Sequence, residues 1–301
     1  MTVRESMKSF VRSEFAVAST FFKTESLSGG SKNIVEDFLD KEDSLVKGPW
    51  LQVFLPFREA EINEEGASVD TAYRFFTNLN SKILGPFRPY AHQEKAFQRL
   101  TGPLPASTII ATGTGSGKTE CFLYPILDYC LTEQKKGVKA VIIYPMNALA
   151  SDQASRLAAL LQRINSQITK IPGCSRRLRA GIYTGDGTSD RRVMTKDELI
   201  TSRDEMRKNP PDIFLTNYKM LDYLVMRPAD NGLWDNGAPD VLKYLVVDEL
   251  HTFDGAQGTD LSCLIRRLKE RTGRTGESEL VCVGTSATIG GKSGLHDLID
   301  F

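Results

Sequence analysis

The chain has 301 residues, of which 41% are hydrophobic and 25% are charged, as in ordinary soluble globular proteins. Lysine plus arginine equals aspartate plus glutamate, 38 of each, which excludes a nucleic-acid binder that works through bulk positive charge but still allows a local basic groove. No run of 18 apolar residues occurs and residues 1–15 lack the apolar core of a signal peptide, so we expect a cytoplasmic protein that makes no membrane contact.

The five cysteines are too scattered for a disulfide or zinc framework. None forms a CxxC pair, so we expect no zinc site in this chain. Their odd number and apolar neighbours predict reduced, buried thiols. They are Cys121, Cys130, Cys174, Cys263 and Cys282.

Residues 1–85 form a region of mixed pattern. Helical stretches are predicted over 7–22 and 34–39, and a strand bounded by prolines over 48–57. The region contains no recognisable chemistry. We therefore predict an accessory region that packs on a main domain formed by residues 86–301.

From residue 85 onward, short β-branched runs alternate with helical patterns. Helices are predicted over 119–133, 147–162 and 258–272, and loops over 186–211 and 227–240. Such alternation predicts an α/β domain whose mainly parallel sheet is covered by helices on both faces. Strands are predicted over 107–111, 140–144, 180–183, 213–215, 244–247 and 280–284.

The strongest local signal is the sequence ATGTGSGKT at residues 111–119. It follows an apolar strand and opens a helix, which is the context that a phosphate-binding P-loop requires. The glycines let the backbone turn its N–H groups toward phosphate oxygens, and the helix adds its positive N-terminal end. Thr112 stands where the strict pattern has glycine.

Two side chains at the end of this loop carry the expected chemistry. Lys118 is predicted to reach the β- and γ-phosphates of ATP, and Thr119 to offer its hydroxyl to Mg²⁺. The residues predicted to hold ATP here are Thr114, Gly115, Ser116, Gly117, Lys118 and Thr119.

The sequence YLVVDELH at residues 244–251 is an apolar strand that ends in two carboxylates. Asp248 is predicted to hold Mg²⁺ and Glu249 to orient or deprotonate the attacking water. His251 is either a buried or capping histidine, or a link between the nucleotide and residues that bind a strand.

The P-loop, the DELH sequence at 248–251 and Ser286-Ala287-Thr288 resemble, in order, motifs I, II and III of the DEAD/DEAH-box superfamily-two helicases. The resemblance extends over residues 87–291. It implies a first RecA-like domain that uses ATP and Mg²⁺, with Lys118, Asp248 and Glu249 in catalysis. It also implies that His251, Ser286 and Thr288 couple the nucleotide to strand binding.

The same resemblance suggests four further sites. Gln93, in the sequence RPYAHQ, corresponds to the amide that reads adenine, and it can both donate and accept hydrogen bonds. Three strand ends resemble the motifs that contact the nucleic-acid backbone, although each alone is typical of a cap or turn. The expected contacts are Pro145, Asn147, Thr184, Gly185, Thr216 and Asn217.

Residues 254–268 are similar to those of large bacterial helicases of the Lhr and MrfA repair type, and to relatives in anti-phage defence. This similarity favours DNA over RNA as the partner. It also implies a second RecA-like domain with an arginine finger, in cis or on another chain, because the sequence ends soon after Thr288. Arg266 and Arg267 are expected to pack or pair on their helix.

Two functions follow from these predictions. The first is the ATP-binding lobe of a DNA helicase or translocase. The alternative is a nucleotide-gated scaffold in a repair or defence complex that does not unwind DNA. Glu249 favours turnover over a passive switch.

Overall fold

The computed structural model describes residues 9, 23–25, 31–33, 56–60, 71–185, 190–238, 240–276 and 279–287. They fall into two compact units, Met1–Pro56 and Phe57–Phe301. In the first unit, β1 (Lys23–Glu25) pairs antiparallel with β2 (Ser31–Asn33). The helices predicted over 7–22 and 34–39, and the strand predicted over 48–57, lie outside the described residues except for residues 9, 56 and 57.

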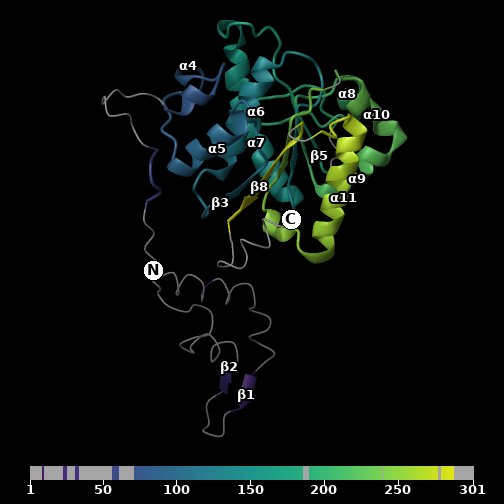
Figure 1. Cartoon of the computed structure of the whole chain (residues 1–301). Coiled ribbons are helices and arrows are strands. Elements are labelled where there is room, and N and C mark those ends of the chain that lie inside the picture. Colours follow the sequence, from purple (N-terminus) through teal and green to yellow (C-terminus); the bar gives the residue numbers. More distant parts are fainter. Residues whose placement is uncertain are drawn as a thin grey trace. The chain divides into compact units, whose positions relative to one another are not determined.

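The second unit is built on one sheet of six parallel strands (Figure 1). The order across the sheet is β3-β8-β7-β4-β6-β5. Every predicted strand is present within two residues of its expected ends, which confirms the α/β prediction. The strands are β3 (Thr108–Ala111), β4 (Ala140–Ile143), β5 (Ala180–Tyr183), β6 (Ile213–Thr216), β7 (Tyr244–Val247) and β8 (Val281–Ser286).

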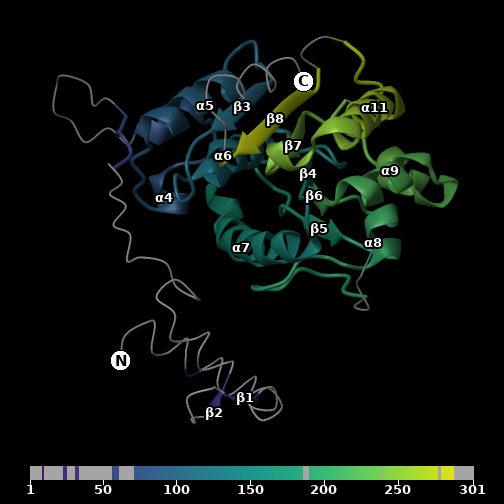
Figure 2. The same ribbon diagram turned by 90° about the horizontal axis from the view of Figure 1, so that it is seen from below.

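Helices cover both faces of this sheet, as the alternating pattern predicts (Figure 2). The helices form two groups, one on each face, and each group covers its own apolar core. On β4, Ile142 belongs to the core under the first group, and the neighbouring Val141 to the core under the second. Among the described residues, no helix is long and apolar enough to cross a membrane. The first group is α4 (Ser81–Leu84), α5 (Ala91–Thr101), α6 (Lys118–Thr132) and α7 (Asn147–Ser166), and the second is α9 (Tyr218–Met226), α10 (Asn231–Asp235) and α11 (Gly255–Thr272).

The two segments predicted as loops contain short helices, so that prediction is wrong in part. Residues 203–208 form α8 (Arg203–Lys208), and 227–240 include η3 (Pro228–Asp230) and α10. The side chain of Ser202 caps α8 by accepting from the N–H of Glu205. Acidic residues in its first turn and basic ones in its last complement the helix dipole. Another short helix, η2 (Ile168–Lys170), follows α7.

Residues 71–84 pack on the helices next to the P-loop strand. They form η1 (Thr71–Phe75) and α4, and the backbone between them is held by the buried carboxylate of Asp128 on α6. Its two oxygens accept from the N–H groups of Thr77, Asn78 and Leu79 at 2.9, 2.6 and 3.0 Å. This packing is what an accessory layer would show, and the division at residue 85 stays a prediction.

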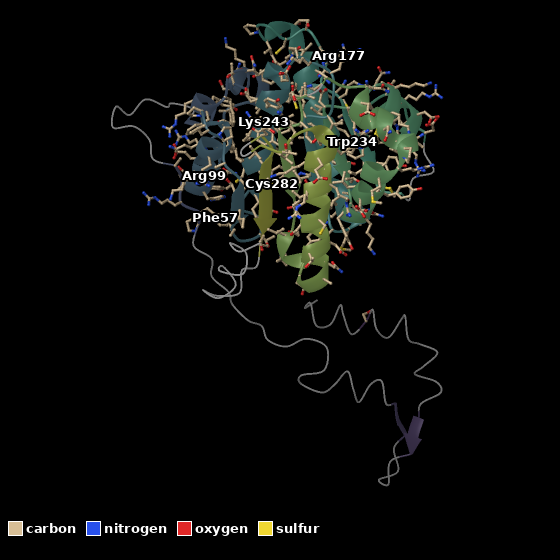
Figure 3. All side chains as sticks on the ribbon, turned by 45° about the vertical axis from the view of Figure 1, so that its right-hand side comes forward. Phe57, Arg99, Arg177, Trp234, Lys243 and Cys282 are labelled. Atoms are coloured by element: carbon tan, nitrogen blue, oxygen red, sulfur yellow. The ribbon has the colours of Figure 1, made fainter. Side chains whose placement is uncertain are left out.

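The prediction of buried thiols is right for three cysteines and wrong for two. Cys121, Cys130 and Cys174 are buried, whereas Cys263 is exposed on α11. Cys282 is half-buried on β8. It and Arg99, both labelled in Figure 3, line a groove of about 810 Å³ beside the edge strand β3. The sequence pattern missed this because an edge strand leaves part of its neighbour's face uncovered.

A buried ion pair lies at the amino-terminal ends of the strands, on the side of the sheet away from the P-loop. Lys139 and Asp212 are fully buried, and Nζ of Lys139 donates to Oδ1 of Asp212 at 2.6 Å. The second carboxylate oxygen accepts from the N–H of Arg179 at 2.9 Å. These contacts tie the starts of β4, β5 and β6 together.

We expect Asp212→Ala to lower the free energy of unfolding by about 3–5 kcal/mol, because it leaves the Lys139 charge buried without its partner. Asp235→Ala is the matched control: its pair with Arg271 is half-exposed, so a loss below about 1 kcal/mol is expected. Urea denaturation of both variants measures the difference. Equal losses would contradict the special role of the buried pair.

Candidate functional site

The predicted motifs meet at one edge of the sheet. Because all six strands run parallel, the loops after β3, β7 and β8 leave from the same side. β8 lies between β3 and β7, so only this one strand stands between the P-loop and the acidic pair. Ligands of open parallel sheets bind at this carboxyl-terminal edge.

The P-loop has the backbone of a phosphate cradle. Gly115 and Gly117 have φ angles of 77° and 76°, which only glycine adopts without strain. Gly117 is the N-cap of α6, so the N–H groups of the first turn open into the loop. Nζ of Lys118 donates to the carbonyls of Thr112 and Gly113 at 3.0 and 3.2 Å.

Thr112, the departure from the strict P-loop pattern, has a structural reason. Its hydroxyl lies 2.6 Å from the hydroxyl of the buried Ser116, so the two side chains tie the ends of the loop together. The N–H of Thr112 also donates to the carbonyl of Ser286 at 3.3 Å. The P-loop is thereby attached to the end of β8.

Gln93 is built into the P-loop support. It is 2% exposed, its Oε1 accepts from the N–H of Tyr90 at 2.9 Å, and its Nε2 donates to the carbonyl of Gly117 at 3.0 Å. A Cβ on Gly117 would lie 2.3 Å from Nε2 of Gln93, so this position also needs glycine for space. In this conformation the Gln93 amide contacts the P-loop.

Three aromatic rings gather beside the P-loop, and the sequence analysis missed them as a group. The ring centroid of Phe57 lies 5.5 Å from that of Tyr90 and 5.7 Å from that of His92. The rings of Tyr90 and His92 stack with their centroids 5.8 Å apart. Nε2 of His92 lies 2.9 Å from the carbonyl of Ser116. Burial lowers the pKa of His92, the Ser116 contact opposes this, and Lys118 lowers the pKa further. The signal available in the sequence was the aromatic content of RPYAHQ.

The acidic pair sits at the end of β7 in a strained turn. Glu249 has a φ of 50°, a conformation that costs a non-glycine residue about 1–3 kcal/mol and tends to occur at functional sites. Burial raises the pKa of Asp248, a hydrogen bond from Thr285 opposes the shift, and Glu249 adds to it. Thr285, one residue before the predicted Ser-Ala-Thr motif, was also missed.

Two of the three residues predicted to couple nucleotide and strand, His251 and Ser286, are in contact. Nδ1 of His251, in η4 (Leu250–Thr252), lies 3.2 Å from the hydroxyl of Ser286 and 3.4 Å from Oε2 of Glu249. Gly284 allows this approach, since a Cβ there would lie 2.7 Å from Leu250. Thr288, the third predicted coupling residue, lies outside the described residues.

The residues predicted to contact nucleic acid lie together after β4, β5 and β6. Nδ2 of Asn217 donates to Oδ1 of Asn147 at 2.8 Å and to the carbonyl of Thr184 at 3.2 Å, and its Oδ1 caps α9. Pro145 is half-buried and Gly185 is exposed. Thr216 is fully buried, and its hydroxyl donates to the carbonyl of Tyr183 at 2.7 Å.

The sequence matches the DEAD/DEAH box helicase family over residues 90–294. The chain belongs to this family. It is 27% identical to the Druantia protein DruE of Escherichia coli (strain UMEA 4076-1) in an alignment of 352 residues, covering 84% of this chain and 19% of DruE. It is 32% identical over 202 residues to the ATP-dependent helicase YprA of Bacillus subtilis, covering 66% of this chain and 23% of that protein.

Solved helicase structures share the fold. The DUF1998 helicase MrfA bound to DNA and AMPPNP superposes with a TM-score of 0.56 and 27% identity, over 80% of this chain and 29% of that one. Lhr of Mycobacterium smegmatis, bound to ssDNA and AMP-PNP, has a TM-score of 0.59 at 22% identity, over 75% of this chain and 26% of that one. The chain thus spans less than a third of each of these relatives.

The residues present fit the nucleotide and metal that this helicase family implies. Gly115 and Gly117 hold open a loop that a side chain would strain. Within the described residues, Oε2 of Glu249 is buried without a hydrogen-bond partner. A buried carboxylate oxygen of this kind is suited to a water or ion at the site.

Proposed function

We propose that residues 86–301 form the ATP-binding lobe of an ATP-dependent DNA helicase or translocase, with residues 1–85 as an accessory region. The observation that carries this proposal is that the P-loop, which bears Lys118, and the acidic pair Asp248 and Glu249 leave the same edge of the sheet on either side of β8. A lysine that reaches the phosphates and a carboxylate that holds Mg²⁺ are parts that phosphoryl transfer uses.

The P-loop residues have distinct roles in this proposal. The N–H groups of Thr114, Gly115, Ser116 and Gly117 would hold the phosphates. Lys118, which now bonds two loop carbonyls, would bind phosphate oxygens instead. When bound, Mg²⁺ would supply charge neutralisation on the phosphates, and Thr119 and Asp248 would hold it.

Gln93 and the aromatic cluster form the base side of the proposed nucleotide site. Gln93 holds Gly117, and its amide retains one further N–H and one lone pair to offer to adenine. Phe57 is 36% exposed beside Tyr90 and offers a ring face on which a base can stack.

The edge formed by Pro145, Asn147, Thr184, Gly185 and Asn217 is the proposed contact surface for the nucleic-acid backbone. Thr216 supports this surface from below through its bond to Tyr183. Contacts of this kind position a strand without reading bases. DNA is the proposed partner because MrfA, at 27% identity, is seen bound to DNA.

We expect Asn217→Ala to weaken binding to all oligonucleotides by a similar factor, because the change removes an N-cap and a bridge between three loops. A fivefold loss corresponds to about 1 kcal/mol. Fluorescence anisotropy with DNA of several sequences, over a range of salt, measures the effect. Asn209→Ala, which removes an amide that bonds Glu205 at the end of α8, is the control. A loss confined to one sequence would contradict backbone contact.

A second RecA-like domain, in cis or on a partner chain, completes the proposed motor. Phosphoryl transfer needs charge on the γ-phosphate from an arginine finger. Arg267, near the acidic motif, does not suit that role, since its side chain on α11 pairs with Asp222 on α9. Movement requires two lobes that close around the nucleotide.

The test is DNA-stimulated ATP hydrolysis by the full-length protein, with Lys118→Ala to exclude contaminants. Stimulation by DNA and unwinding of a duplex support the helicase proposal. Hydrolysis without strand displacement would favour the nucleotide-gated scaffold for defence, which the relationship to DruE makes the second candidate. Stimulation by RNA alone would overturn the choice of DNA.

A further inference from the structure

Thr285 is a fully buried residue that touches both members of the acidic pair. It lies near the end of β8, beside the end of β7. Its hydroxyl donates a hydrogen bond to Oδ1 of Asp248. The hydroxyl oxygen of Thr285 also accepts a hydrogen bond from the N–H of Glu249 at 3.2 Å. A single hydroxyl is therefore shared by the side chain of one acid and the backbone of the other.

The bond to Asp248 fixes the direction of its carboxylate. Asp248 is 9% exposed, so its charged form needs hydrogen-bond donors nearby. Thr285 supplies one to Oδ1 from a β-branched side chain with few accessible rotamers. Partners of this kind orient carboxylates that hold metals.

The bond from Glu249 stabilises the strained turn. Its φ of 50° costs energy that the surroundings must offset, and a buried N–H without a partner would add to that cost. The Thr285 oxygen accepts that N–H. The Thr285 hydroxyl thus supports the backbone from which the Glu249 side chain projects.

The end of β8 also reaches the other parts of the site. Ser286, the next residue, accepts from the N–H of Thr112 and contacts His251. From this geometry we infer that Thr285 is a positioning residue for ATP hydrolysis, which holds Asp248 and Glu249 in register with the P-loop. This inference rests on the proposed ATPase function.

The test compares Thr285→Val with Thr285→Ser in the full-length protein. Valine keeps the shape but removes the hydroxyl, and serine keeps the hydroxyl. For Thr285→Val we expect the Mg²⁺ concentration that half-saturates ATP binding in calorimetry to rise and kcat to fall, each by about tenfold or more, as for other residues that orient metal ligands. Thr285→Ser should restore both values to within about threefold of the wild type.

Two controls separate positioning from loss of stability. Thr272→Val removes a hydroxyl that donates to the carbonyl of Leu268 at 2.7 Å on α11, so it reports the cost of one lost hydrogen bond away from the site. It should leave the Mg²⁺ requirement unchanged. If Thr285→Val does not fold, Thr285→Ala takes its place, and it too should raise the Mg²⁺ requirement above that of Thr285→Ser.

The outcomes are distinguishable. If the wild type hydrolyses ATP in a Lys118-dependent manner but the valine or alanine variant has the wild-type Mg²⁺ requirement and kcat, Thr285 has no positioning role. The inference is also overturned if serine fails as badly as valine, since the hydroxyl is then not the active feature. If the wild type neither binds nor hydrolyses Mg²⁺·ATP, the proposed function itself fails.

Discussion

Replacing Lys118 with alanine is expected to weaken ATP binding by about 100-fold, equivalent to about 3 kcal/mol, because a charge-assisted contact to phosphate is lost. In the structure the Lys118 ammonium group is held only by two backbone carbonyls of its own loop among the described contacts, at 3.0 and 3.2 Å. Those neutral acceptors give way easily to a triphosphate. Isothermal titration calorimetry with Mg²⁺·ATP measures the change.

Lys170→Ala is the matched control for this experiment. Lys170 is an exposed lysine in η2, after the far end of α7, so its removal changes the net charge equally and should leave ATP binding unchanged. The removed Lys118 side chain also supports the loop, so circular dichroism should confirm that the variant is folded. A Lys118→Ala protein that binds Mg²⁺·ATP like the wild type would show that the P-loop assignment is mistaken.

Replacing Glu249 with glutamine is expected to lower the rate of ATP hydrolysis by about 10²-fold or more, the usual worth of a positioned base, while the affinity for ATP changes little. Glutamine has the size of glutamate and can still hydrogen-bond, but it cannot take a proton from water. The αL backbone at Glu249 and its buried Oε2, which accepts no hydrogen bond among the described residues, place the carboxylate in a prepared position beside His251. Single-turnover kinetics and nucleotide titration separate the two quantities.

The control for this second experiment is Glu270→Gln, which makes the same chemical change at an exposed position on α11. It should hydrolyse ATP at the wild-type rate. Glu249 would lose the role of base if the Glu249→Gln protein turned over ATP as fast as this control. A large loss of ATP affinity in the variant would instead indicate that Glu249 acts in binding.

The sequence analysis used patterns of residues close together in the chain, and its errors arise where such patterns are too short or do not show what the fold places nearby. It found all six strands of the sheet because buried parallel strands are short apolar runs bounded by turns. It missed α8 because six residues are too few for a periodic apolar face, although Ser202 and the charges of both turns mark the ends of that helix. It placed Cys282 in the core because its neighbours in sequence are apolar, whereas exposure depends on the lie of β8 next to an edge strand.

The candidate site likewise has parts that local sequence patterns reveal and parts that only the fold brings together. The sequence by itself determined the P-loop, the acidic pair and the parallel sheet, because each depends on residues that are adjacent or regularly spaced along the chain. Only the tertiary structure brought Thr285 to Asp248, Phe57 to His92 and Asn147 to Asn217. These pairs come from separate loops and strand ends. Their contact follows from the order β3-β8-β7-β4-β6-β5 and from the packing of the chain around it, neither of which a local pattern encodes.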